Sequence, residues 1–115
     1  METRNDFLKD IFITAIEGGI NYWCIVKNYR WNCEDFSCKV IEYDEDTDSH
    51  KNRYNLNAAV IEQGILKVKE RSFQVNSDIL AYILLADHNN DAGDIDSICA
   101  DVIVQAGLFG EIVYG

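Results

Sequence analysis

The first part of the chain has hydrophobic residues at helical spacing, over residues 5–17. They repeat every three or four positions and so share one broad face of a helix: Phe7, Leu8, Ile11, Phe12, Ala15 and Ile16. Thr3 and Asp6 have the spacing of a capping pair, with Asn5 as an alternative cap. The double glycine 18–19 follows, and one of its residues can adopt the left-handed conformation that commonly ends a helix.

The pattern then changes to the β-branched and aromatic content of strands. Residues 22–31 predict a first strand, and alternate positions in it share one face: Trp23, Ile25, Tyr29 and Trp31. Residues 38–43 and 52–56 predict two further strands, and residues 112–114 predict a short last one. The sheet is therefore expected to contain three or four strands.

Helical spacing returns after the third strand. Asn57 is placed to cap a second helix that runs to about Arg71. Gly64 lies inside this helix, where glycine costs about 1 kcal/mol relative to alanine. That cost indicates close packing against another element.

Two more helices complete the pattern. Asn76 or Ser77 caps the third, whose residues 79–86 are apolar on nearly every side, as in a buried helix. We expect Asp94 to cap the fourth helix and Gly107 to end it. The buried stripe of the fourth helix is Ile95, Ile98, Cys99, Val102, Ile103 and Ala106.

The resulting order, α-β-β-β-α-α-α-β, predicts an α+β fold in which a small antiparallel sheet packs against about four helices. We expect one compact domain over residues 1–115, because the length is typical of a single domain and 48% of the residues are hydrophobic. No apolar run is long enough to span a membrane, and no signal peptide is visible. These features favour a cytoplasmic protein with no membrane partner.

The charge distribution is uneven. The net charge is −10, and no lysine or arginine follows Arg71. The last 44 residues therefore carry −7, whereas the first 71 carry −3, with ten basic against thirteen acidic residues. Such a balance disfavours direct binding of nucleic acid, which depends on clustered lysine and arginine. The complementary partner is a basic protein or a metal cation.

Two acidic stretches are the candidate contacts for a basic partner. The first is a predicted hairpin tip that is either a solvated turn or a protruding negative finger: Asp44, Glu45, Asp46 and Asp48. The second follows Arg71 and includes Asp87, Asp91 and Asp94. An exposed Trp31 would add apolar anchoring area, because Trp and Tyr are frequent interface hot spots.

The sequence contains no complete motif for metal binding or catalysis. Residues 87–98 begin like a calcium-binding EF-hand loop, but Ala92 occupies the glycine position and Ile98 the position of the bidentate glutamate. No metal or cofactor is therefore predicted. No nucleophile motif or phosphate-binding loop supports an enzyme. Cys24, Cys38 and Cys99 are expected to be small core residues with free thiols, because a reducing compartment disfavours disulfides.

Two stretches, 14–23 (TAIEGGINYW) and 100–115 (ADVIVQAGLFGEIVYG), combine a helix end, glycines, a carboxylate and aromatic residues. Their patterns TAxEGGxxYW and ADxxxQxxxFGExxYG resemble a group of small proteins from phages, prophages and plasmids. The resemblance covers the two ends of the chain, about a third of it, and implies no catalytic residues. It implies a mobile-element protein, a class that includes anti-CRISPR and other anti-defence inhibitors.

The first functional hypothesis is thus an acidic, non-enzymatic protein that binds and inhibits a bacterial nucleic-acid-binding or defence protein. The second is a regulatory protein that binds a small ligand or metal where the two motifs meet. Its candidate site residues are Glu17, Tyr22, Trp23 and Glu111. The third is a homo-oligomeric structural component whose two motifs simply pack together.

Overall fold

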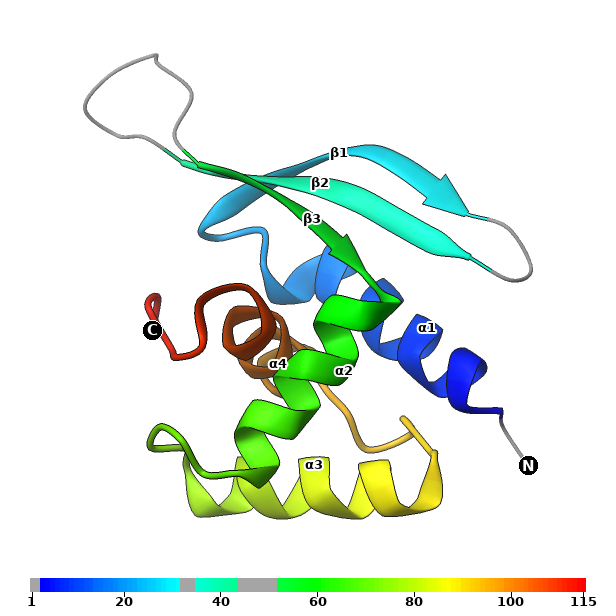
Figure 1. The fold of residues 1–115 in the computed structure, drawn as a ribbon, viewed down its shortest axis with the longest axis vertical. Helices are drawn as coiled ribbons and strands as arrows, with labels where there is room; N and C mark the ends of the chain where they lie inside the picture. The colour runs from blue at the N-terminus through cyan, green and yellow to red at the C-terminus, as the bar shows by residue number, and fades with distance from the viewer. Residues whose placement is uncertain (1–2, 32–34, 44–51) are drawn as a thin grey trace.

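The computed structural model describes residues 3–31, 35–43 and 52–115 of the chain. A three-stranded antiparallel sheet lies on one side of this part of the protein, and the α-helices all lie on its other side (Figure 1). The α+β class with an antiparallel sheet is confirmed. The elements are α1 (Arg4–Thr14), the π-helical turn η1 (Ala15–Gly19), β1 (Cys24–Trp31), β2 (Phe36–Glu42), β3 (Arg53–Asn57), α2 (Ala58–Lys69), α3 (Ser77–Asn89) and α4 (Ser97–Phe109).

The predicted last strand is wrong. Residues 112–114 have no strand partner among the described residues and form an irregular tail. This tail returns along α4, whose side chains hold its backbone. Its apolar residues are therefore explained by packing on a helix and not by a sheet.

Side-chain caps begin the first three α-helices as the sequence predicts. Thr3 and Asp6 form the reciprocal capping box of α1. Asn57 caps α2 by accepting from the Val60 amide, and Asn76 caps α3. Each cap satisfies amide groups that the first helical turn leaves unpaired.

Both predicted ends of α4 are shifted. Asp96, and not Asp94, is the N-cap, and its carboxylate accepts from the amide of Cys99 at 2.8 Å. Gly107 lies inside the helix, which ends instead at Gly110 in the left-handed conformation (φ 78°). Both observed ends of α4 therefore lie two or three residues later than predicted.

Gly64 and Gly107 allow α2 and α4 to cross with their backbones in close contact. A Cβ atom on Gly64 would lie 2.0 Å from the carbonyl oxygen of Ile103. A Cβ atom on Gly107 would lie 2.2 Å from the carbonyl oxygen of Val60. The close packing predicted for Gly64 is confirmed, and it explains why a helix interior retains a residue of low helical propensity.

The double glycine after α1 does not end it through a left-handed residue. Gly18 and Gly19 lie within η1, and Ile20 closes this turn by donating its amide to the carbonyl of Ala15 at 3.0 Å. A Cβ atom on Gly19 would lie 2.9 Å from the carbonyl oxygen of Ser97 in α4. Gly19 is therefore required for close approach of two elements.

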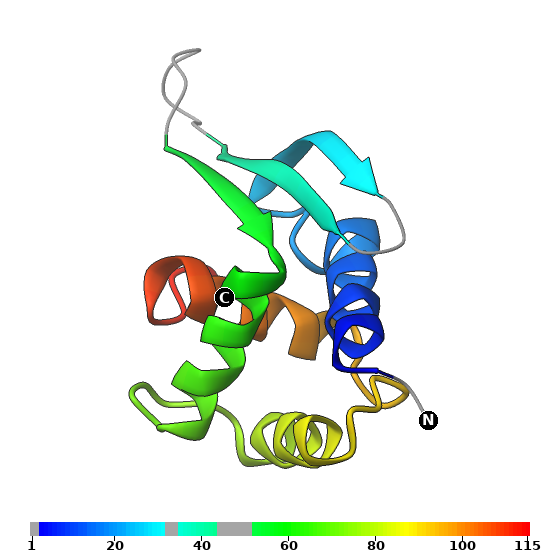
Figure 2. The same ribbon diagram turned by 45° about the vertical axis from the view of Figure 1, so that its right-hand side comes forward.

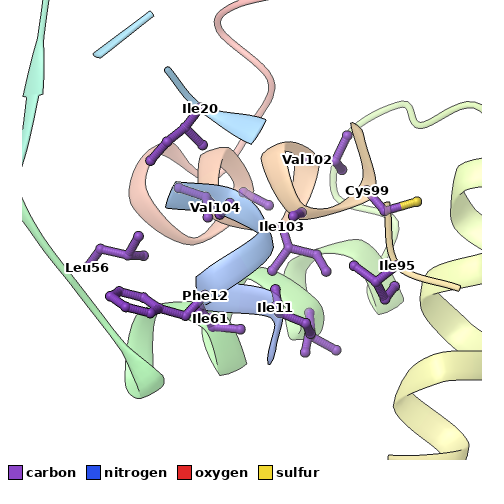
Figure 3. Packing of buried hydrophobic residues seen from close by; sticks show 14 of the residues in the cluster. Ile11, Phe12, Ile20, Leu56, Ile61, Ile95, Cys99, Val102, Ile103 and Val104 are labelled. Carbon is purple, nitrogen blue, oxygen red and sulfur yellow. The ribbon is translucent and has the colours of Figure 1, made fainter. Parts of the chain in front are cut away.

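The core lies between the sheet and α1, α2 and α4 (Figures 2 and 3). Its side chains include Ile11 and Phe12 of α1, Leu56 of β3, Ile61 of α2 and Ile103 of α4, each almost fully buried. From Cys99 to Ala106 every residue of α4 is buried. The helix that carries part of the second motif is thus the central one.

The prediction that α3 is buried is wrong. It forms the outermost layer on the side of the molecule away from the sheet (Figure 1). Only Ile83 and Ala86 of this helix are buried, whereas Tyr82 and Leu85 are 49% and 56% exposed. A helix that is apolar all round here leaves one apolar face without a partner in the described structure.

The sheet has the order β1-β2-β3 and contains a bulge in β1. One extra residue near Asn28 (φ 53°) reverses which side chains face inward. Ile25 therefore points outward, whereas Tyr29 and Trp31 lie on the inner face, where both rings contact Phe12. The predicted common face of these three side chains is wrong because the alternation is interrupted.

Candidate functional site

The two sequence motifs meet around one buried carboxylate. Asp101 of α4 accepts hydrogen bonds from the Tyr22 hydroxyl at 2.6 Å, the Trp23 indole nitrogen at 2.9 Å and the Gln105 side-chain amide at 2.9 Å. Asp101 is 8% exposed and Gln105 is fully buried. Their spacing of four residues places both side chains on the same side of α4.

Gln105 also fixes the end of the chain. Its Oε1 accepts from the amides of Val113 and Tyr114, both at 2.9 Å, and its Nε2 donates to the carbonyl of Tyr114 at 3.0 Å. The Tyr114 ring stacks on Trp23, with 5.0 Å between ring centroids, and Phe109 packs against Trp23 at 5.5 Å. We refer to Tyr22, Trp23, Asp101, Gln105 and Tyr114 as the clasp.

The polar groups of the clasp are already paired with one another. No buried side-chain nitrogen or oxygen in the described residues lacks a hydrogen-bond partner. Burial of its hydroxyl and the hydrogen bond to Asp101 raise the pKa of Tyr22 to about 12. Tyr22 therefore remains a protonated donor at neutral pH. The clasp therefore gives these five motif residues a structural role: it joins the segment between η1 and β1 to α4 and to the C-terminal tail.

An open cleft of about 450 Å³ lies beside the clasp. Gly18 and Gly19 form one wall, and Ile98, Val102 and Ile112 contribute apolar surface. Because the neighbouring polar groups bond within the clasp, the free surface of this cleft is mainly suited to an apolar group.

The two glutamates predicted for this site are not part of the clasp. Glu17 and Glu111 are both exposed, and neither makes a hydrogen bond or ion pair with another described residue. Glu17 borders a different, shallower hollow with Ile25 and Tyr43. Of the predicted ligand-site residues, Tyr22 and Trp23 are brought together, and the glutamates lie outside their hydrogen-bond network.

Sequence reasoning did not select Asp101 and Gln105 as site residues. The available signal was their position: two polar residues four apart, within an otherwise apolar helix. A polar side chain that is buried among apolar ones costs free energy unless it forms hydrogen bonds, so both residues are expected to have hydrogen-bond partners. Their partners are the Tyr and Trp of the first motif.

Asp87, predicted to contact a partner, is occupied within the fold. Its carboxylate pairs with Arg4 at 2.7 Å and with Lys69 at 3.0 Å, and its side chain is 10% exposed. Burial alone would raise the pKa of Asp87, but the hydrogen bonds from Lys69 and Arg4 outweigh it and lower the pKa. This network joins the start of α1 to α2 and α3.

Asp91 and Asp94 are exposed in the loop that follows α3. Asp91 accepts from the amide of Gly93 at 2.9 Å, which leaves its charge facing solvent. Trp31 is 41% exposed, and the Lys9 ammonium lies 4.1 Å from its ring centroid. The predicted acidic finger, Asp44, Glu45, Asp46 and Asp48, lies outside the described residues.

The cysteines support the core interpretation. Cys24, Cys38 and Cys99 are buried and unpaired. Burial raises the pKa of the Cys24 thiol to about 12 and those of Cys38 and Cys99 to about 11. Within the described ranges, no group of three or more His, Cys, Asp or Glu side chains is arranged to hold a metal ion.

Comparisons of the chain with protein-family models, with curated proteins and with solved structures give no match. Among the described helices, none is both long enough and apolar enough to cross a membrane.

Proposed function

We propose that the protein is a non-enzymatic interaction protein that binds a basic surface of a bacterial nucleic-acid-binding or defence protein and inhibits it. The observation that supports this proposal is the exposed face of α3. Spacing of three to four residues brings Asp78, Ala81, Tyr82 and Leu85 to one side of the helix, and all four are exposed. These four residues are the α3 surface.

Apolar area on the α3 surface is of the kind that anchors protein interfaces. Tyr82 and Leu85 lie one turn apart and are about half exposed. An aromatic residue beside an aliphatic one, surrounded by polar groups, is typical of an interface centre. Full burial of a large apolar side chain contributes about 1.5–3 kcal/mol, so a partner that covers the exposed half of Tyr82 and Leu85 would gain roughly half of this for each.

Acidic residues flank this apolar area in the sequence. Helix α3 and the loop up to α4 carry four exposed carboxylates and no lysine or arginine: Asp78, Asp91, Asp94 and Asp96. Carboxylates of this kind steer a basic partner and disfavour an acidic one. On a nucleic-acid-binding partner, they would occupy positions that phosphates normally fill. The resemblance of the two motifs to mobile-element proteins supports a bacterial host protein as the target.

The experiment is a capture from bacterial lysate treated with nuclease, with Tyr82→Ser/Leu85→Ser compared with wild-type bait. Leu66→Ser is the matched control, because Leu66 is 46% exposed on a different helix, α2. A partner retained by wild type and the control, and lost by the α3 variant, supports the proposal. Equal retention by all three baits would remove α3 from the interface.

The cleft beside the clasp favours a second candidate, a regulator that binds a small, mainly apolar ligand. Its motif walls and its volume of about 450 Å³ support this alternative. A ligand that binds the folded state raises the melting temperature. A thermal-shift panel of small apolar acids and nucleosides, repeated on Val102→Trp to fill the cleft, tests it; an unchanged melting temperature throughout would reject it.

A further inference from the structure

The outward face of the sheet has a different chemistry from the rest of the protein. In β2 and β3 the inward positions are identified by burial, as at Cys38, Val40 and Leu56. Strand pairing then assigns the intervening and opposite positions to the outward face: Ile25, Lys27, Arg30, Ser37, Lys39, Ile41, Arg53 and Asn55. The helices lie on the other side of the sheet (Figure 1), so most of this face is open to solvent, and only Ile41 of these outward residues is buried.

Four of these outward residues are cations: Lys27, Arg30, Lys39 and Arg53. No carboxylate occupies an outward position of the described strands. The face is therefore positive in a chain whose net charge is −10. Its cations are dispersed along the sequence, and only the sheet brings them together.

The cations form a line across the sheet. Arg30 pairs with Ser37, two positions before Lys39 on β2, and Lys39 lies two positions before Ile41, which pairs with Arg53. Diagonal neighbours of this kind are about 7–8 Å apart, so one cation from each strand follows a diagonal. Lys27 lies directly opposite Lys39, an arrangement of like charges that destabilises a sheet and that a bound anion would relieve.

A polar groove accompanies this line. It has a volume of about 450 Å³ and is lined by Arg30, Ser37, Lys39 and Asn55, with Tyr29 at one side. The Lys39 ammonium donates to the side-chain oxygen of Asn55, which orients the amide of Asn55.

We propose that this face binds single-stranded nucleic acid, with successive phosphates along the diagonal Arg30, Lys39 and Arg53. A positive groove that follows the phosphate backbone is how such strands are held without sequence preference. The linear arrangement of the cations favours a flexible polyanionic strand over a rounded acidic protein surface. This proposal is independent of the α3 surface.

The test is fluorescence anisotropy of a labelled oligo-dT of about 20 nucleotides, titrated with the full chain from about 50 to about 300 mM salt. The three cations of the diagonal and Lys27 together would neutralise four phosphates, so the logarithm of the association constant should fall with the logarithm of salt with a slope of about −2.8. Arg30→Gln/Lys39→Gln is expected to reduce this slope to about −1.4 and to weaken binding about tenfold or more at the lowest salt.

Lys67→Gln/Arg71→Gln removes the same charge from the end of α2 and is expected to bind like wild type. Lys27→Gln, whose side chain makes no ion pair with a described residue, gives a second variant that does not disturb the Lys39–Asn55 contact. Circular dichroism establishes that each variant is folded.

Three results would overturn the proposal. The first is no anisotropy change at the lowest salt, and the second is equal binding by wild type and the sheet variant. The third is binding of poly-glutamate or of a duplex of the same length with affinity equal to or higher than that for the single strand. Poly-glutamate binding would assign the face to an acidic protein.

Discussion

At the scale of single residues, Asp101 is the carboxylate that connects the two motifs. It accepts three hydrogen bonds, two of them from the first motif, while it is almost fully buried. Hydrogen bonds to a charged group are worth about 1.5–3 kcal/mol each when they cannot be replaced by water. The contact between the two motifs therefore depends on Asp101.

We expect Asp101→Asn to destabilise the protein by about 2 kcal/mol or more, because an amide cannot accept from Tyr22, Trp23 and Gln105 together. Urea unfolding followed by tryptophan fluorescence measures the change. Asp94→Asn, at an exposed position, should change stability by less than about 0.5 kcal/mol. Equal effects of the two substitutions would mean that the clasp does not hold the motifs together.

Asp87 gives the fold a defined response to acid. Its pKa is lowered from the ordinary value of 3.8 in the folded protein, so its ion pairs stabilise the fold above that value. This stabilisation is lost as the pH falls through the folded pKa, below 3.8.

The prediction is that Asp87→Asn is less stable than wild type at neutral pH and that this difference shrinks as the pH falls below about 4. Urea midpoints across this pH range test it, with Asp94→Asn as the reference variant. A difference that is constant with pH would show that the ion pairs with Arg4 and Lys69 do not contribute.

At the scale of elements, the contact of α2 with α4 depends on two glycines. Gly64→Ala or Gly107→Ala would place a Cβ atom against a backbone carbonyl, which cannot move independently of its helix. We expect each substitution to cost about 1–3 kcal/mol, although alanine is the better helix former.

Gly18→Ala is the matched control, because a Cβ atom there meets nothing within 4 Å. This control should leave stability unchanged or raise it by up to about 1 kcal/mol. Thermal melts of the three variants compare them directly. A stabilising effect at Gly64 would contradict the close backbone contact.

The type and order of the first seven predicted elements followed from hydrophobic spacing and capping residues. What spacing did not reveal depended on contacts between elements. A one-residue bulge at Asn28 changed the faces of β1, and Gln105 held the tail that resembled a strand. Helix α3 has the composition of a buried helix, but only its position in the fold shows that one side remains uncovered.

At the scale of the whole molecule, different elements carry the exposed charges. The outward sheet face carries cations, whereas exposed carboxylates lie on α3, which is on the side away from the sheet (Figures 1 and 2), and on the loop that follows it. Total charge predicted the acidic side, since no cation follows Arg71 in the sequence. It could not predict the basic side, because Lys27, Arg30 and Lys39 are adjacent only after the strands pair.

The candidate site was predicted only in part, because its contacts also form between residues that are far apart in the sequence. The two motifs were recognised as related, and Tyr22 and Trp23 were selected from the first. Their partner Asp101 belongs to the second motif, but only the fold shows that this buried carboxylate faces an indole and a phenol. Exposed Glu17 and Glu111 have no comparable partners in the described structure.

Binding of a basic protein by the α3 surface can be measured by titration calorimetry with the purified captured partner. We predict that the affinity falls at least about tenfold between about 50 and about 500 mM salt, as screening removes the charge attraction. Tyr82→Ser/Leu85→Ser should abolish binding at both salt concentrations, whereas Leu66→Ser should not. Affinity that is insensitive to salt and unchanged in the α3 variant would contradict the proposed binding.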